Sequence, residues 1–301
     1  MMKKIMIAGS TLLDLKGCPF TTYNKDGRNA GYIIEKAGGV ARNVCEDLAH
    51  VGIHPIFLTV LDHSAASTDI ATHLQQCGTD VSHITYTEDG LGKWLAVFDE
   101  HGDVVSSISQ RPNLEPLRHV LKELGDVIAS SCDGIVCALD IDRIVLEQLF
   151  YLAEKYDVPV YGLVSNMTIA NQRMDLIQKT ACFVCNKEEA SILFQKNFMS
   201  MHGIELIDVL AQQRKEMHLQ QLIVTDGPYG AVYVSSKEAG HVPCADVEVV
   251  DTTGCGDAFF AGAVASLVQG SSLCEAALQG TKLAGAALAT HDNVCPMMIG
   301  K

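Results

Sequence analysis

The chain has 301 residues and a formal net charge of -14, with 36 acidic against 22 basic side chains. Its 48% hydrophobic and 19% charged residues describe a folded protein of at least one full domain rather than a disordered chain. The acidic balance, without a block of lysines and arginines, excludes the electrostatic footprint of a protein that binds duplex nucleic acid, so we expect small-molecule ligands.

The chain contains no apolar run near the ~18 residues of a membrane-spanning helix, and its first strand follows the initiating methionines without a signal peptide. We therefore expect a cytoplasmic protein without membrane contact. Its 11 cysteines are then reduced core residues rather than a disulfide framework. Cys182 and Cys185 form a C-x-x-C within a strand pattern, where they point to opposite faces, so we do not expect a zinc or redox site there.

The expected elements alternate along the chain. Apolar runs predict strands at residues 4–9, 53–61, 134–139, 158–164, 181–185 and 220–227. Helical spacing of apolar residues predicts helices at residues 40–52, 68–78, 144–157 and near 205–217. Strands that alternate with helices of this length predict a mostly parallel sheet with helices on both faces.

Two stretches, residues 11–37 and 84–112, break this alternation. Both are rich in β-forming residues, and EHGD at residues 100–103 is a plausible hairpin turn. We expect the two stretches to pair as a small β-sheet lid over the carboxyl ends of the main strands, where open α/β sheets bind ligands. Because there is no internal repeat and no linker, we expect a single domain over residues 1–301.

Residues 247–263 read VEVVDTTGCGDAFFAGA, and this stretch predicts a strand at 247–250 followed by a helix that begins at the glycines. The backbone N–H groups of Gly254, Cys255 and Gly256 then have no intrahelical partners. Together with the positive end of the helix dipole they predict an anion site that a phosphate can approach closely.

Asp257 lies next to this anion site, where a carboxylate repels a phosphate and so does not serve binding alone. It does suit a general base that takes the proton of a hydroxyl during phosphoryl transfer. Asp251 either caps the turn or approaches a metal. The alternative is that Asp257 is simply a favourable acid in a first helical turn, and the stretch alone leaves both open. No dinucleotide or P-loop glycine motif occurs, which disfavours a dinucleotide-dependent oxidoreductase.

DTTGCGD at residues 251–257 resembles the D-T-x-G-A-G-D signature of the ribokinase/PfkB family of carbohydrate and nucleoside kinases, with Cys255 in place of the usual Ala. AGGVARNVCEDLAHVG at residues 37–52 is similar to the amino-terminal signature of that family. The resemblance spans nearly the whole chain. It implies a ribokinase-like three-layer α/β/α fold with a mostly parallel sheet and a β lid, and an ATP- and Mg²⁺-dependent phosphotransferase with an alcohol group as acceptor.

The resemblance also implies where ATP and metal ions bind. NKEE at residues 186–189 resembles the N-x-x-E motif that helps hold magnesium and phosphate through water, and VTDGPYGA at residues 224–231 is similar to the nucleotide-binding strand and turn. The residues assigned to ATP in this way are Asn186, Glu189, Thr225, Gly227, Gly230 and Asn293, the last at the adenine pocket. The family often uses a monovalent cation such as K⁺ near Asp251. The thiol of Cys255 is either activated by the helix terminus or an inert small side chain.

On the acceptor side, Asp14 matches the family Asp that binds sugar hydroxyls, while Gly38, Gly39 and Asn43 match the sugar-contacting turn. A carboxylate that accepts two hydroxyl hydrogens selects a vicinal diol, so a ribose-like ring is expected. The alternative for Asp14 is an ordinary turn residue.

The segments DLKG, GGVARN and KWLAVFDEHGDVVSSIS resemble the pseudouridine kinase branch of the family. Leu163 and the pair Gln110 and Arg111 depart from that branch at positions that can touch the base. We expect phosphorylation of the 5'-hydroxyl of a nucleoside, with pseudouridine first. The alternatives are another sugar or nucleoside acceptor (as in ribokinase, fructokinase, adenosine or inosine kinases) or an inactive ligand-binding protein of the same fold. The exposed edges of a protruding sheet favour a homodimer through the lid.

Overall fold

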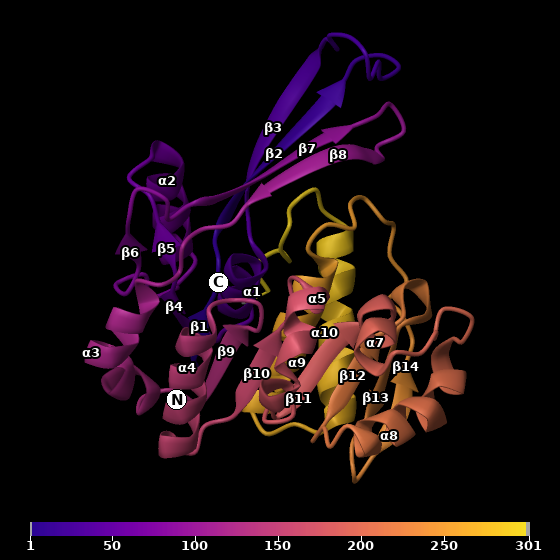
Figure 1. Cartoon of the computed structure of the whole chain (residues 1–301). Helices are drawn as coiled ribbons and strands as arrows, with labels where there is room; N and C mark the ends of the chain where they lie inside the picture. The colour runs from indigo at the N-terminus through magenta and orange to yellow at the C-terminus, as the bar shows by residue number, and fades with distance from the viewer. Residues whose placement is uncertain (1, 299–301) are drawn as a thin grey trace.

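The computed structural model describes residues 2–298, which form one large sheet, one smaller sheet and a short two-stranded sheet. The large sheet has the strand order β14-β13-β12-β11-β10-β9-β1-β4, and the smaller one β3-β2-β7-β8. The smaller sheet projects from the main body of the molecule, as Figure 1 shows.

The large sheet is mostly parallel, as predicted. Its strands are β1 (Lys4–Ala8), β4 (His54–Leu58), β9 (Gly134–Ala138), β10 (Val160–Leu163), β11 (Cys182–Asn186), β12 (Leu222–Thr225), β13 (Ala231–Val234) and β14 (Ala239–Val242). The pairs from β4 to β12 are parallel, whereas β13 and β14 close one edge in antiparallel pairs. The carboxyl ends of the six parallel strands β4, β1, β9, β10, β11 and β12 therefore meet at one edge of the sheet.

Helices cover both faces of this sheet and make three layers. On one face lie α3 (Leu117–Ala129), α4 (Arg143–Tyr156), α5 (Met167–Ala170), α6 (Met174–Ile177), α7 (Lys187–Phe194) and α8 (Leu206–Glu216). On the other lie α1 (Val40–His50), α2 (Ala65–Gln76), α9 (Cys255–Val268) and α10 (Leu273–Leu288). Short 3₁₀ turns are η1 (Asn171–Arg173), η2 (Gly203–Glu205) and η3 (Gly227–Tyr229). Within residues 2–298, no helix is both long and apolar enough to cross a membrane.

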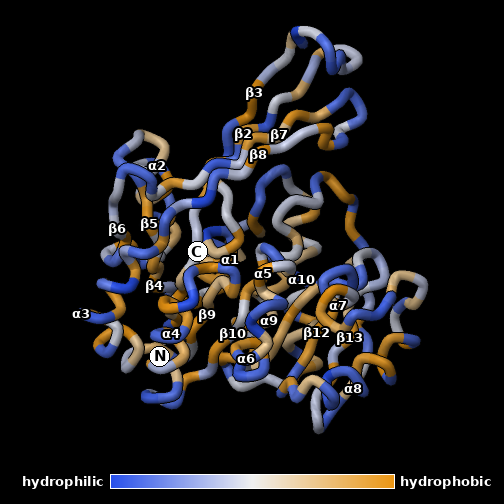
Figure 2. The backbone as a smooth tube through the Cα atoms, in the orientation of Figure 1, coloured by the Kyte–Doolittle hydropathy of each residue, from blue (hydrophilic) through white to orange (hydrophobic). Residues whose placement is uncertain are grey.

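Strand β1 shows why the sheet is buried on both faces. Met6 and Ala8 belong to the core on one face, and Ile5 and Ile7 to the core on the other, with no exposed surface on any of the four. Side chains alternate along a strand, so a strand covered on both sides is a continuous hydrophobic run, which Figure 2 shows along the central strands. Cys182 and Cys185 divide between the two cores in the same way, so their C-x-x-C does not form a joint pair.

The smaller sheet pairs two separated stretches, as predicted. Its strands are β2 (Leu12–Pro19), β3 (Gly31–Gly38), β7 (Gly92–Phe98) and β8 (Val104–Gln110). The second stretch begins at residue 92 rather than 84, because β6 (Thr85–Tyr86) pairs with β5 (Val60–Leu61) in the two-stranded sheet. A Cβ on Gly90 would lie 2.1 Å from the carbonyl oxygen of Leu61, so the chain turns tightly against β5 before it enters β7.

The expected strand at residues 247–250 is wrong. No regular secondary structure lies between β14 and α9, and Val249 and Val250 are 59% and 43% exposed. Pro243 follows β14 directly and has no N–H group with which to continue the ladder. The segment instead reaches α9 as a loop, in which the N–H of Val250 donates to the carbonyl of Leu288 at 2.8 Å.

Candidate active site

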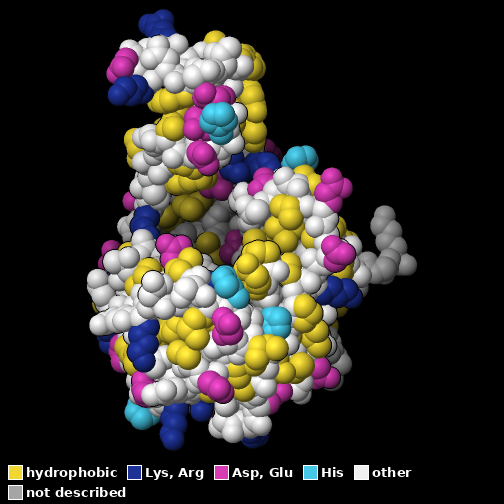
Figure 3. Space-filling view, turned by 90° about the vertical axis from the view of Figure 1, so that its right-hand side faces the viewer, with side chains coloured by type: hydrophobic (Ala, Val, Ile, Leu, Met, Phe, Trp, Pro, Cys, Tyr) yellow, Lys and Arg dark blue, Asp and Glu magenta, His cyan; other side chains and the backbone are white. Residues whose placement is uncertain are grey.

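Two cavities lie at the carboxyl ends of the parallel strands, and Asp257 lines both. The first, called here the inter-sheet cavity, has a volume of about 370 Å³ and lies between the small sheet and the ends of β1, β9 and β10. The second, called the α7 cavity, has about 220 Å³ and lies over the ends of β10, β11 and β12. The space-filling view in Figure 3 shows a hollow between the projecting sheet and the main body.

Asp257 lies in the first turn of α9, directly after the glycines. Gly254 is the N-cap with φ of 80°, and a Cβ there would lie 1.9 Å from the carbonyl oxygen of Asn293. A Cβ on Gly256 would meet no atom within 4 Å, so the backbone at this residue borders open space in the α7 cavity. The N–H of Cys255 donates to Thr252 at a long 3.4 Å. The structure thus has the expected helix N-terminus with glycines at the cavity, and its use as an anion site stays a prediction.

The carboxyl group of Asp257 is tuned to neutral pH. Burial, helped by the nearby carboxyl groups of Glu189 and Asp14, outweighs the lowering effect of a hydrogen bond from Asn43 and raises the pKa of Asp257 to about 7. In that bond Asn43 Nδ2 donates to Asp257 Oδ2 at 2.8 Å. A carboxylate whose pKa lies near the working pH is well suited to general-base catalysis.

Asp14 is brought into the inter-sheet cavity by β2. It is 9% exposed, and burial raises its pKa against the opposing charges of Lys16 and Arg42. A Cβ on Gly38 would lie 2.4 Å from Asp14 Oδ2, and one on Gly39, whose φ is 97°, would lie 2.7 Å from Ser10 O. The Gly-Gly pair is therefore needed for this close packing, with Gly39 in the cavity wall and Gly38 directly behind Asp14.

Asn186 and Glu189 lie together in the α7 cavity, where they also cap α7. Asn186 Oδ1 accepts from the N–H of Glu189 at 2.8 Å, and Glu189 Oε2 accepts from the N–H of Asn186 at 2.8 Å. Burial raises the pKa of Glu189. Thr225, at the end of β12, completes this wall. Amide, hydroxyl and carboxylate oxygens are the donors that Mg²⁺ prefers, so the residues present fit this ion.

Of the other residues predicted to bind the nucleotide, Gly227 and Gly230 line neither cavity and Asn293 lines the inter-sheet cavity. Gly227 has φ of 53° and a Cβ there would meet nothing, whereas a Cβ on Gly230 would lie 2.0 Å from Val242 O, so Gly230 serves a tight turn. Asn293 lines the inter-sheet cavity beside Gly254 instead of lying with Thr225. It is 5% exposed, and neither of its amide atoms has a partner among the described residues.

The contacts of Asp251 and Cys255 favour structural roles for both residues. Asp251 Oδ1 accepts from the N–H of Thr253 at 2.9 Å, which makes it a cap of the turn. Burial tends to raise the pKa of Asp251, but the bonds from Thr253 and the charges of Lys16 and Lys36 outweigh it and lower the pKa. The pKa of the Cys255 thiol is raised by burial and by Asp257, which favours an inert small side chain over an activated thiol.

Sequence reasoning missed part of the inter-sheet cavity. The missed lining residues are Trp94, Ser109, Asp140 and Ser165. Arg111 Nη1 pairs with Asp140 Oδ2 at 3.0 Å, and the Ser165 hydroxyl donates to the same oxygen at 2.6 Å. Asp140 and Ser165 each follow a buried strand, and that position was the available signal. Arg111 does reach this cavity, whereas Leu163 lines the α7 cavity.

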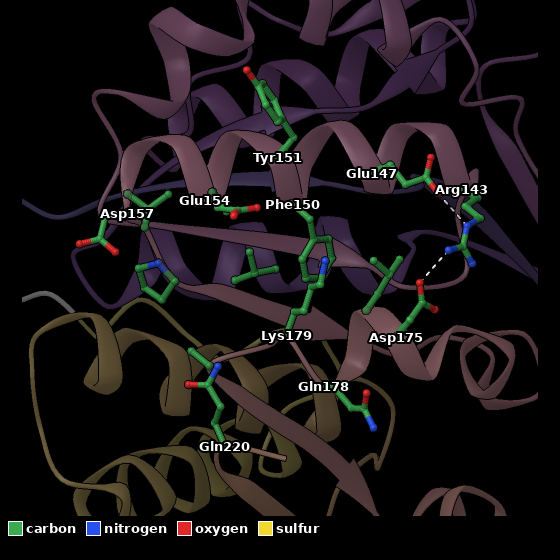
Figure 4. A pocket seen from close by; sticks show the side chains of 16 residues that line it. Arg143, Glu147, Phe150, Tyr151, Glu154, Asp157, Asp175, Gln178, Lys179 and Gln220 are labelled. Carbon is green, nitrogen blue, oxygen red and sulfur yellow. Dashed lines mark hydrogen bonds and ion pairs between the residues drawn. The ribbon is translucent and has the colours of Figure 1, made fainter. Parts of the chain in front are cut away.

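A further cavity of about 920 Å³ lies at the other end of the sheet, where β10, β11 and β12 begin (Figure 4). Arg143 bridges Glu147 at 2.8 Å and Asp175 at 2.6 Å on its wall. None of the motif residues lines it. The chemistry therefore belongs to the two smaller cavities, although this one has more space.

A parallel α/β sheet with a small projecting sheet, and a carboxylate at an anion-binding helix end between two cavities, defines a ribokinase-like phosphotransferase that acts on an alcohol group. The profile described as pfkB family carbohydrate kinase matches residues 2–296, and the chain belongs to this family. The kinase class and the fold predicted from the sequence are thus confirmed.

Two relatives and one solved structure are similar to this protein over nearly the whole chain. The chain is 32% identical to the guanosine-inosine kinase of Exiguobacterium acetylicum, across 97% of this chain and 96% of the relative. It is 24% identical to the pseudouridine kinase of Escherichia coli (strain K12), across 90% and 86%. The structure of Arabidopsis thaliana ribokinase complexed with ribose and ATP superposes with a TM-score of 0.86 at 19% identity, across 99% and 97% of the two chains. Pseudouridine as the acceptor stays a prediction.

Proposed function

We propose that this protein is an ATP-dependent nucleoside kinase that phosphorylates the 5'-hydroxyl group of its acceptor. The observation that carries the proposal is that Asp257 lines both cavities. A nucleoside in the inter-sheet cavity and a triphosphate in the α7 cavity then meet at one carboxylate, whose pKa of about 7 suits a proton acceptor.

In this mechanism Asp14 accepts hydrogen bonds from the ribose hydroxyl groups and Asn43 holds Asp257. Asp257 takes the proton of the 5'-hydroxyl, the oxygen attacks the γ-phosphorus, and the bond from that phosphorus to the leaving ADP oxygen breaks. The free N–H groups at the start of α9 stabilise the charge on the transferred group. When bound by Asn186 and Glu189, Mg²⁺ neutralises phosphate charge. K⁺ near Asp251 stays a prediction.

We assign the adenine of ATP to an apolar cavity of about 440 Å³ between the loop after β14 and α10. Val242, Val247, Leu278 and Ala286 are among its lining residues. An apolar slot of this kind suits the flat face of a base. Asn293, which lines the inter-sheet cavity, is then available to the acceptor or the transferred phosphate, and Gly227 borders open space where the nucleotide can pass.

The pair Arg111 and Asp140 favours a base with a lactam edge. Arg111 donates only, and Asp140 accepts from both Arg111 and Ser165, so together they match a carbonyl next to a ring N–H. Hypoxanthine, guanine and uracil present this edge, whereas adenine presents an acceptor nitrogen next to an amino donor. Trp94, on the same face of the small sheet as Asp14, offers a ring for stacking.

Guanosine and inosine are the acceptors that we place first. They carry the lactam edge, and the 32% identity to a guanosine-inosine kinase extends over both chains. Pseudouridine is the second candidate, because its uracil ring shares that edge and the lid wording DLKG and GGVARN resembles that branch. Adenosine, cytidine, ribose and fructose lack the edge or the base.

The test is ATP consumption with guanosine, inosine, pseudouridine, uridine, adenosine, cytidine, ribose and fructose, compared by kcat/KM. We expect at least ~10²-fold preference for lactam bases over adenosine and cytidine, because the wrong edge opposes donor to donor and leaves the Asp140 carboxylate without a base N–H. Equal rates with adenosine contradict the role of Arg111 and Asp140. No turnover with any acceptor would support the inactive ligand-binding protein instead.

The outer face of the small sheet supports the expected homodimer. Ile33, Leu95 and Ile108 are 72%, 40% and 67% exposed and lie on the face opposite Asp14 and Trp94, according to the strand register. Such an apolar row is commonly covered by another subunit. We expect Ile108→Asp to convert a dimer into a monomer in light scattering; a monomeric native protein contradicts this arrangement.

A further inference from the structure

A row of buried polar side chains leads away from Asp257 through α1. Asn43 donates to Asp257 at 2.8 Å and accepts at Oδ1 from Arg42 Nη1 at 3.1 Å. An arginine only donates, so this contact fixes the Asn43 amide with its NH₂ group toward Asp257. Arg42 in turn forms an ion pair with Glu46, and these two residues are 5% and 3% exposed.

Beyond Glu46 the row reaches two side chains with good metal-ligand atoms. His73 lies on α2 and Cys77 follows that helix directly, four residues later, so both face the same side. His73 Nε2 lies 2.7 Å from Glu46 Oε1, and Cys77 Sγ lies 3.6 Å from His73 Nε2. The ligand atoms of all three residues lie within 4.8 Å of one another.

Imidazole, thiolate and carboxylate together are typical ligands of Zn²⁺. Zinc bonds of ~2.0 to 2.3 Å in a tetrahedron set neighbouring ligand atoms about 3.3 to 3.8 Å apart. The separation of Cys77 Sγ and His73 Nε2 already satisfies this, and the separation of His73 Nε2 and Glu46 Oε1 must grow by about 0.6 Å. The side chain of His73 is 52% exposed, so His73 can make this movement, and an ion can enter from solvent.

His50 contributes a second imidazole beside Glu46. Its Nδ1 lies 2.7 Å from the carbonyl oxygen of Cys295, which fixes the ring, and its Nε2 lies 3.8 Å from Glu46 Oε1.

We propose that Glu46, His73 and Cys77 form a binding site for a divalent cation of the Zn²⁺ class, and that Arg42 and Asn43 connect this site to the active site. A cation that shares Glu46 weakens its hold on Arg42, and the Asn43 amide that orients Asp257 is then less firmly fixed. The cation lowers turnover from outside the two cavities. This connection rests on the proposed kinase function, whereas the binding site does not.

Binding is tested with Co²⁺ as the probe on the full chain after metal removal, by the near-ultraviolet charge-transfer band of a thiolate bound to Co²⁺. We expect the band in the native protein, its loss in Cys77→Ser, and at least ~10-fold weaker binding in His73→Gln. Cys274→Ser, which removes a half-buried cysteine elsewhere, is the matched control and keeps the band. A native protein without the band, or a Cys77→Ser protein that retains it, overturns the site.

The connection is tested by kinase turnover with Zn²⁺ added at saturating Mg²⁺ and ATP. We expect kcat of the native protein to fall at least about fivefold, the lower range of coupling between distant sites, and that of Cys77→Ser to stay unchanged. Equal inhibition of both proteins shows that zinc acts at the active site itself and overturns the connection. If no acceptor supports turnover, the kinase proposal fails while the Co²⁺ result still decides the binding site.

Discussion

The two cavities that share Asp257 are built in different ways. The α7 cavity takes its polar atoms from places where the chain leaves a strand or enters a helix: Asn186 ends β11 and caps α7, Thr225 ends β12, and Gly256 lies in the first turn of α9. The inter-sheet cavity combines the small sheet with loops after β1, β9 and β10 and with the loop after α10. Both cavities are assembled from distant segments, but the polar residues of the α7 cavity each carry a local sequence signal, whereas the inter-sheet cavity depends on how two sheets lie against each other.

The residues of the two cavities differ in how freely they can be substituted. In the proposed function, phosphate is held by backbone N–H groups of α9 and by Asn186 and Glu189, and because these two side chains also cap α7, changes to them damage the fold as well as the ligand site. In the same proposal the acceptor meets Trp94 of the small sheet and Arg111, which directly follows it. The same transfer chemistry can therefore serve different acceptors through changes in the small sheet and neighbouring loops.

The largest expected effect on turnover follows from substitution of Asp257, which lines both cavities. We expect Asp257→Asn to lower kcat by at least the ~10² to 10⁴-fold of general-base catalysis, because the amide cannot take the hydroxyl proton. ATP affinity, measured by equilibrium titration, should remain within about threefold because the N–H groups of α9 are untouched. Turnover near that of the native protein would contradict the base assignment.

The next largest effect distinguishes the inter-sheet cavity, proposed for the acceptor, from the α7 cavity, proposed for the triphosphate. Asp14→Ala removes hydrogen bonds to a buried carboxylate, each worth about 1.5 to 3 kcal/mol, and we expect the KM for the acceptor to rise ~10 to 100-fold. The KM for ATP should not change. If both KM values rise together, the two cavities do not bind the two substrates separately.

Two glycine variants test which substrate each cavity binds, with smaller expected effects. A Cβ on Gly38 presses on Asp14 at 2.4 Å, so Gly38→Ala should weaken acceptor binding by about 10-fold. Gly256→Ala meets no protein atom and should leave the melting temperature unchanged, yet weaken ATP binding by a similar factor. Initial-rate kinetics with each substrate varied in turn decide this, and a reversed pattern would assign the cavities the other way round.

The smallest effect concerns pH. Since burial raises the pKa of Asp257 to about 7, kcat/KM should rise with pH through about 7 and then level off as the carboxylate forms. Asn43→Leu removes the bond that lowers this pKa, so the midpoint should move to higher pH. An unmoved midpoint assigns the titration to another group.

The same shift sets a pH dependence of stability. The unfolded chain ionises Asp257 near the usual value of 3.8, whereas the folded protein resists ionisation up to about pH 7, so this residue increasingly destabilises the fold between those values. We expect Asp257→Asn to melt at a higher temperature than the native protein at pH 8, and the difference to vanish below about pH 4. A difference that persists at low pH has another cause.

The polar residues of the α7 cavity were predictable from sequence, whereas those of the inter-sheet cavity were only partly so. Asn186 and Thr225 each lie where a hydrophobic run meets a turn or helix signal, which places them at the carboxyl end of a strand. Gly256 was found from the glycines at the start of a helix pattern, although no strand precedes that helix. Asp140 and Ser165 also each follow a buried strand, but without a motif their role depends on which segments lie opposite, and register across two sheets is not readable from spacing.

One error has a local physical reason. The run at residues 247–250 has the β-branched pattern of a strand, but Pro243 ends β14 and the chain leaves the sheet there as a loop that leads to α9. The role of Asn293 at the adenine stays a prediction from the family resemblance; in the structure it packs against Gly254 and lines the inter-sheet cavity.

The alternation of the small sheet has a thermodynamic consequence. Trp94 faces the inter-sheet cavity while its neighbour Leu95 faces outward, so the same strand presents one surface to the ligand and the other to solvent. If ligand binding straightens or stiffens that strand, it alters the outer surface as well. In the proposed dimer, ligand affinity and self-association would then change each other by the same factor, and the apparent affinity for the acceptor would depend on protein concentration.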